Sequence, residues 1–217
     1  MRRKTFSYRG IFERFGYPLT KSDALPSGLL ARTEERLGVS IPAALRDYYL
    51  LAGNEKRFNR SNQRFLHPSK WFVNEKYLVF LEENQYVCWW GVSLKRPNAT
   101  DPAVAQGIKD PEEITWITEA RKCSFFLTMM LHYQAAFGGF PFCGSAAAPD
   151  NLHEMLKKGW DYVGEMSQLW AFSRQCQVVC VTVNSFIPFM PAMMLYAGGK
   201  TKDDFRSIEE SLSITLQ

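Results

Sequence analysis

The segment Leu30–Asn54 constrains the fold more than any other part of this 217-residue chain; it reads LARTEERLGVSIPAALRDYYLLAGN. Apolar residues recur at helical spacing on both sides of Gly38 and Pro42. A glycine suits the left-handed conformation that ends a helix, and a proline suits the first turn of the next helix. The segment therefore predicts two short helices joined by a tight turn, with Glu34 and Arg46 beside an apolar stripe.

The rest of the chain alternates between strand and helix patterns. Residues 76–81 and 86–94 predict a hairpin with a turn at 82–85, and residues 124–137 predict an apolar helix. The last third predicts strands at 169–172, 177–183 and 193–197, then a helix with Thr201 and Asp204 in a capping box. Helices at both ends with most strands between them indicate the α+β class with an antiparallel sheet, and the length favours a single domain over residues 1–217.

Two adjacent tryptophans lie in the second strand of the predicted hairpin. Because side chains alternate along a strand, Trp89 and Trp90 are expected to point to opposite faces of the sheet. At most one of them is then needed for the core, and the other is free to cover a helix or to meet a partner.

Charge and cysteine content limit the classes of function. The net charge of +4 is a small excess, so we expect no direct contact with nucleic acid. The five cysteines show no disulfide or zinc spacing, which favours a reducing cytoplasm. The apolar stretches 124–142 and 178–197 are interrupted by polar residues, glycines or prolines, so we expect no membrane span.

No local pattern indicates catalysis. The sequence has no phosphate-binding loop, no dinucleotide fingerprint and no HExxH motif. His132 falls within the apolar helix at 124–137, where a structural role is expected rather than that of a base. We therefore expect a protein that is not an enzyme and that holds no metal or cofactor. An enzyme whose catalytic groups converge from distant segments stays open as an alternative, and it would need a deep pocket with perturbed titratable groups.

Several weak features occur in the order found in one known family. The run Glu34-x-x-Leu-Gly-x-x-Ile-Pro-x-x-Leu-Arg46, the hairpin strand Tyr77–Leu81 followed by Glu83-Asn84, and Asp101-Pro102-x-Val104 resemble the SMI1/KNR4 family of the SUKH superfamily. The later Phe-Phe-Leu helix and the closing Ala-Gly-Gly-x-Thr segment fit as well. The resemblance is strongest over residues 27–140, with residues 1–26 as an N-terminal extension. It implies one α+β domain with a bent antiparallel sheet flanked by helices.

The resemblance also implies a function in protein binding. Many bacterial relatives are immunity proteins that bind a cognate polymorphic toxin, often a nuclease, and block it by occlusion. Fungal relatives act as regulators through protein contacts, so a regulatory or scaffolding protein without a toxin partner is the alternative. The expected partner is thus a protein, with a toxin domain such as a nuclease as the first hypothesis; the oligomeric state is not indicated.

Six residues are the candidate partner contacts. Tight immunity complexes need aromatic or arginine anchors ringed by polar groups. The candidates are Arg57, Trp71, Glu82, Glu83, Trp89 and Trp90. Two charge patterns suggest opposite partners: an acidic area from Glu82, Glu83, Asp110, Glu112 and Glu113 suits a basic nuclease site, whereas the basic loop from Lys56 to Arg64 suits an acidic partner.

Overall fold

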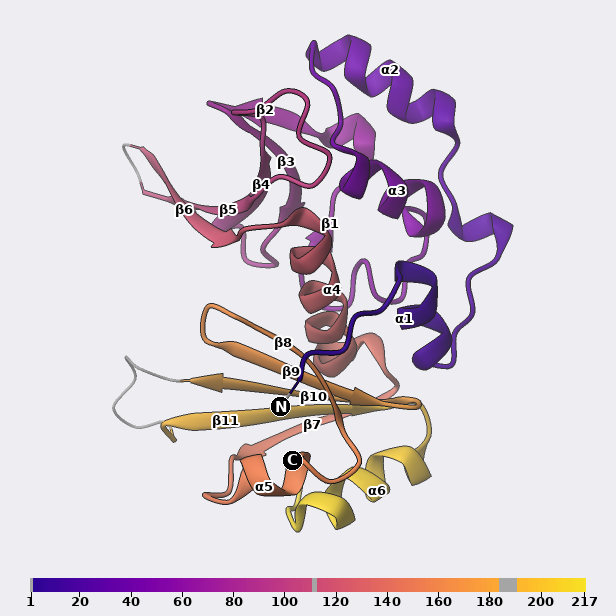
Figure 1. Ribbon diagram of the computed structural model, residues 1–217, viewed down its shortest axis with the longest axis vertical. Coiled ribbons are helices and arrows are strands. Elements are labelled where there is room, and N and C mark those ends of the chain that lie inside the picture. Colours follow the sequence, from indigo (N-terminus) through magenta and orange to yellow (C-terminus); the bar gives the residue numbers. More distant parts are fainter. Residues whose placement is uncertain (1, 111–112, 184–190) are drawn as a thin grey trace. The chain divides into compact units, whose positions relative to one another are not determined.

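The computed structural model describes residues 2–110, 113–183 and 191–217, and it divides the chain into two compact units. We call residues 19–127 the helix-pair unit, and residues 1–18 with 128–217 the C-terminal unit. Each unit has its own antiparallel sheet (Figure 1). The α+β class is confirmed. The strands, however, form two sheets where the sequence predicted one.

The helix-pair unit begins with the two helices expected from the sequence. Its helical elements are η1 (Lys21–Asp23), α2 (Ser27–Leu37), α3 (Ala43–Ala52), η2 (Pro68–Lys70) and the start of α4 (Cys123–Gln134). Gly38 ends α2 with a φ of 65°, and its N–H donates to the Glu34 carbonyl. The Glu34 carboxylate then accepts hydrogen bonds from the Ile41 N–H at 2.7 Å and from Arg46. One carboxylate thereby fixes the turn between the two helices.

The first sheet belongs to the helix-pair unit and has the strand order β1-β3-β4-β5-β6, with β2 also paired to β3. Its strands are β1 (Arg64–Phe65), β2 (Phe72–Asn74), β3 (Tyr77–Glu82), β4 (Cys88–Ser93), β5 (Val104–Lys109) and β6 (Ile114–Ala120). The segment 54–70, which includes the basic loop from Lys56 to Arg64, contains the short strand β1 and the turn η2. One face of this sheet packs against α4, where Phe126 lies 5.9 Å from Phe80 and 6.3 Å from Trp90 between ring centres.

The C-terminal unit contains the second sheet, with the order β7-β11-β10-β9-β8. Its strands are β7 (Phe142–Ala147), β8 (Asp161–Met166), β9 (Leu169–Arg174), β10 (Gln177–Val183) and β11 (Met193–Gly199); its helical elements are α1 (Tyr8–Arg14), the rest of α4, a π-helical turn η3 (Ala135–Gly139), α5 (Leu152–Leu156) and α6 (Lys202–Leu212). The predicted capping box at the start of α6 is confirmed, because Thr201 and Asp204 exchange side-chain to backbone hydrogen bonds.

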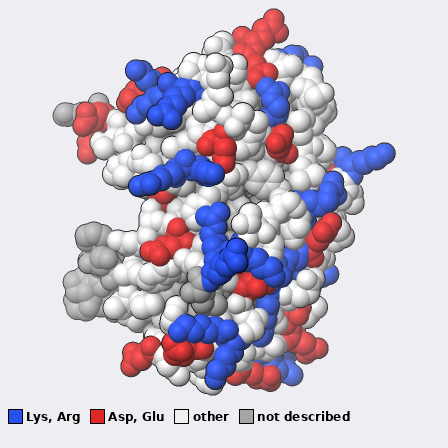
Figure 2. Space-filling model, viewed as in Figure 1, with Lys and Arg blue, Asp and Glu red and all other residues white. Residues whose placement is uncertain are grey.

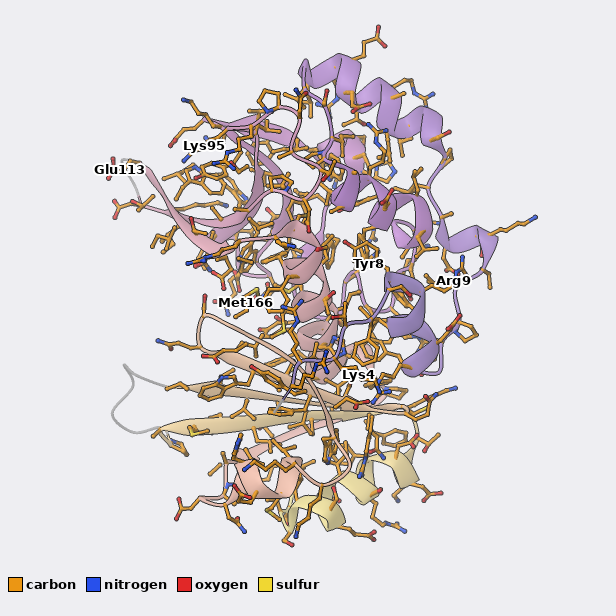
Figure 3. All side chains as sticks on the ribbon, viewed as in Figure 1. Lys4, Tyr8, Arg9, Lys95, Glu113 and Met166 are labelled. Atoms are coloured by element: carbon orange, nitrogen blue, oxygen red, sulfur yellow. The ribbon has the colours of Figure 1, made fainter. Side chains whose placement is uncertain are left out.

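Both edges of the second sheet are paired with the ends of the chain. The Lys4 N–H donates to the Tyr162 carbonyl on β8, and Gln217 exchanges two backbone hydrogen bonds with Ser145 on β7. Lys4, labelled in Figure 3, also forms an ion pair with Asp161 at 2.9 Å. These contacts satisfy edge groups that would otherwise be available to another strand.

His132 lies in the core of the C-terminal unit, as the sequence predicted. It is fully buried, its ring is edge-on to Phe15 at 5.1 Å, and its Nδ1 lies 2.8 Å from the Thr128 carbonyl. A carbonyl only accepts, so Nδ1 carries the proton and Nε2 does not. Burial, reinforced by the nearby Arg14 charge, lowers the pKa of His132 to about 4 and keeps the ring neutral at pH 7.

Candidate functional site

The face of the first sheet opposite α4 carries no helix from the described residues of the helix-pair unit (Figure 1). Aromatic side chains from four strands lie on this face. We call this set the outer aromatic surface: Phe72 on β2, Tyr77 on β3, Trp89 on β4 and Trp116 on β6. Tyr77 is buried, and the other three are half-buried. Each of these three therefore presents part of an aromatic ring outward.

Two glycines let one indole lie flat on the sheet. A Cβ on Gly91 would lie 3.1 Å from the Trp116 ring, and a Cβ on Gly107 would lie 2.9 Å from it. A larger residue at either position would therefore crowd the indole. The same ring stacks on Tyr77 with 4.3 Å between centres, and its Nε1 donates to the Asn74 side chain at 3.0 Å. Glycine within a strand typically marks such a close approach. Trp116 is thus held by contacts on three sides.

Trp89 is held in a different way. Its ring is edge-on to Phe72 at 5.0 Å, and the Lys109 ammonium lies 3.8 Å above the ring centre. Lys109 also donates to the Tyr86 carbonyl at 2.7 Å, so the cation is fixed over the indole. Lys95, labelled in Figure 3, lies 5.3 Å from the Tyr77 ring in the same manner. Such cation–π contacts favour a fixed ring orientation.

The turn between β3 and β4 extends the apolar area. Tyr86 and Val87 are 53% and 55% exposed, and Val87 directly precedes β4, two residues before Trp89. The Glu83 carboxylate holds the turn by accepting from the Gln85 N–H at 2.6 Å. Arg64 lies 4.5 Å above the Tyr86 ring. The turn therefore presents two large apolar side chains at defined positions.

Strand β6 forms an edge of the first sheet. Within the described residues, β6 pairs with β5 alone. This edge contrasts with the second sheet, whose two edges bond to the chain ends. A strand at the edge of a sheet can in general pair with a further strand. The outer aromatic surface thus borders a second feature suited to a protein contact.

Three of the six candidate contacts come together on this side of the first sheet. Glu82 is the cross-strand neighbour of Trp89, and Glu83 follows it in the turn. Asp110 and Glu113 lie in the next turn at the same end of the sheet, where the Lys109 N–H donates to the Val87 carbonyl and links the two turns. Glu112 lies outside the described residues. Figure 2 shows that both acidic and basic side chains lie on the face in view.

The other three candidates lie elsewhere. Trp71 is 1% exposed, packs edge-on against Tyr49 at 4.7 Å and donates from Nε1 to the Leu66 carbonyl. It is a core residue, so the hypothesis that it anchors a partner is wrong. Trp90 is also buried and faces α4, opposite to Trp89, which confirms the predicted alternation and removes Trp90 as an anchor. Arg57 is exposed in the segment before β1.

The sequence reasoning missed Phe72, Trp116 and Lys109 as members of this site. One signal for Trp116 was Gly91 within the predicted strand 86–94, because a glycine inside a strand often marks the close approach of a bulky group. Gly107 gave no such signal, because no strand was predicted around it. Nothing local indicated Lys109, because its position over Trp89 depends on the pairing of β4 with β5.

No three His, Cys, Asp or Glu side chains among the described residues come together as a metal site would require, and none of the described helices has the length and apolarity needed to cross a bilayer. Comparison of the chain with protein-family models, with curated proteins and with solved structures finds no match.

Proposed function

We propose that this protein is a cytoplasmic binding protein of the SMI1/KNR4 immunity type, which neutralises a cognate toxin by covering it with the outer aromatic surface. The resemblance of residues 27–140 motivates the class. The geometry of the helix pair supports it, since Glu34 ties the two helices through Ile41 and Arg46 at the positions that carry the resemblance.

The single observation that carries the proposal is the position of Trp89. An indole that is half-buried, held by Phe72 and Lys109 and not covered by any described helix of its own unit suits a binding anchor. Tryptophan, tyrosine and arginine are the residue types that most often dominate binding energy. Because Trp89 is already oriented, little side-chain entropy is lost when a partner packs on it.

Occlusion needs a preformed surface and no chemical step. The partner would place an apolar group against Trp89, Tyr86 and Val87, and polar groups at the rim would pair with Glu82 and Lys109. The rim charges set orientation and association rate more than affinity. A basic active-site rim on the toxin would meet Glu82 and Glu83.

The test is a pair of expression experiments with the product of the neighbouring gene in the source genome. Expressed alone, that product should stop growth; expressed together with this protein, it should permit growth and copurify with it. Growth arrest that persists during co-expression would refute the proposal. Copurification with several proteins that are harmless when expressed alone would favour the regulatory alternative.

A further inference from the structure

The C-terminal unit contains a pocket of about 800 Å³ between α5 and the second sheet. Its floor is formed by Phe172, Val181 and Met193, and its wall by Leu152 and Leu156 of α5. Most of these side chains belong to the hydrophobic core that α5 and α6 form with the sheet. Leu152, Leu156, Phe172 and Val181 are at most 5% exposed, so they close the bottom of the pocket. The partly exposed side chains of Tyr162, Trp170 and Met193 form its accessible apolar surface, and its size matches sites for small molecules.

The rim of the pocket carries two carboxylates. Asp150 precedes α5 and Glu165 lies on β8; both are exposed, and within the described residues neither forms an ion pair or a side-chain hydrogen bond. The nearby Lys157 is paired with Glu154 at 2.7 Å. Burial, and then the charge of Glu165, raise the pKa of Tyr162, which lines the same pocket. The charge of Arg3 opposes this rise in the pKa of Tyr162 and is the smallest of the three influences. Because no Lys or Arg is among the described residues that line the pocket, the two carboxylates give its opening a negative potential.

A π face also lies at this opening. Trp170 is half-buried, lines the pocket and is the cross-strand neighbour of Glu165. An indole beside a carboxylate favours an organic ammonium group through both cation–π and Coulomb attraction. An anionic ligand would meet both carboxylates, and a neutral one would gain nothing from them.

We propose that this pocket binds a small apolar molecule that carries a positively charged amine. The apolar skeleton packs against the partly exposed side chains of Tyr162, Trp170 and Met193, and the ammonium group lies between Asp150 and Glu165, beside the Trp170 ring. This site is separate from the outer aromatic surface, so its test is independent of the proposed immunity function.

The experiment compares three probes with the same apolar chain and different head groups, namely octylammonium, octanol and octanoate, by isothermal titration calorimetry on the full chain at pH 7. We expect octylammonium to bind about tenfold more tightly than octanol and octanoate to bind most weakly, because one ammonium–carboxylate contact near the surface is worth roughly one decade in affinity. Equal affinities for the three probes, or no binding of octylammonium, would overturn the proposal.

Two sets of variants locate the site. Asp150→Asn combined with Glu165→Gln should bring the affinity for octylammonium to that for octanol while leaving octanol unchanged. Ala148→Trp should block the pocket, and Ala147→Trp provides a matched control because Ala147 is exposed and does not line it. Octylammonium binding that survives Ala148→Trp, or that is lost equally in both tryptophan variants, would place the ligand elsewhere and contradict the assignment.

Discussion

The buried histidine of α4 makes the stability of the C-terminal unit depend on pH in a defined window. In the native state the pKa of His132 is about 4, whereas in the unfolded chain it returns to about 6.5. Above pH 6.5 the ring is neutral in both states, and the full stability is present. Below pH 6.5 only the unfolded chain takes up the proton, so acid favours unfolding.

The magnitude follows from the same two pKa values. The free energy of unfolding should fall by about 1.4 kcal/mol for each pH unit below 6.5, which gives about 2 kcal/mol between pH 6.5 and pH 5. At pH 4 the loss should level off near 3 kcal/mol. The window from pH 6.5 to 5 is the informative part, because most carboxylates remain charged there.

The assay is urea unfolding at several pH values, with His132→Leu as the control. Leucine keeps the site apolar and removes the titrating ring together with its hydrogen bond to Thr128. The free energy of unfolding of the wild type should fall as the pH is lowered from 6.5 to 5. The fall in the variant over the same range should be smaller by about 2 kcal/mol. Equal slopes for the two proteins would refute the assignment of a depressed histidine.

The remaining stability predictions concern one residue each. Trp71→Ala should lower the free energy of unfolding by about 3–5 kcal/mol, since it empties a fully buried site, and thermal unfolding would detect it. Thr201→Ala should cost about 1 kcal/mol through loss of the α6 cap; a variant as stable as wild type would contradict the importance of the cap. Partial burial alone would raise the pKa of Glu34, but its hydrogen bonds to Arg46 and Ile41 outweigh this effect and lower it. Glu34→Gln should therefore cost up to about 1 kcal/mol at pH 7 and progressively less as the pH falls through the ordinary glutamate range, where the wild type loses the same charge.

Local sequence patterns were sufficient to predict the features that depend on residues close to one another in the sequence. The left-handed Gly38, the Thr201 capping box, the alternation of Trp89 with Trp90 and the buried His132 all followed from spacing and residue type. In each case the structure-determining contact joins residues close in the sequence, or the periodicity of the apolar residues alone determines which face of the strand or helix a side chain lies on.

Long-range pairing decided the features that the sequence did not predict. The last four strands pair with one another and with β7 to form a separate sheet, and nothing in their composition distinguishes this arrangement from strands added to the first sheet. Trp71 follows a polar, basic loop, so its burial against Tyr49 was not visible from its neighbours. The outer aromatic surface likewise depends on the register that brings Trp89, Gly107 and Trp116 into one row.

The central claim is that Trp89 anchors a protein partner. The most direct measurement is the affinity of the copurified partner for Trp89→Ala, compared with Phe142→Ala as a control for loss of an aromatic side chain, because Phe142 is 38% exposed and lies on β7 of the C-terminal unit. We predict a loss of at least about 30-fold for Trp89→Ala and less than about threefold for Phe142→Ala, as expected for an anchor and for a residue outside the contact. A Trp89→Ala protein that is folded and binds as tightly as wild type would contradict the account.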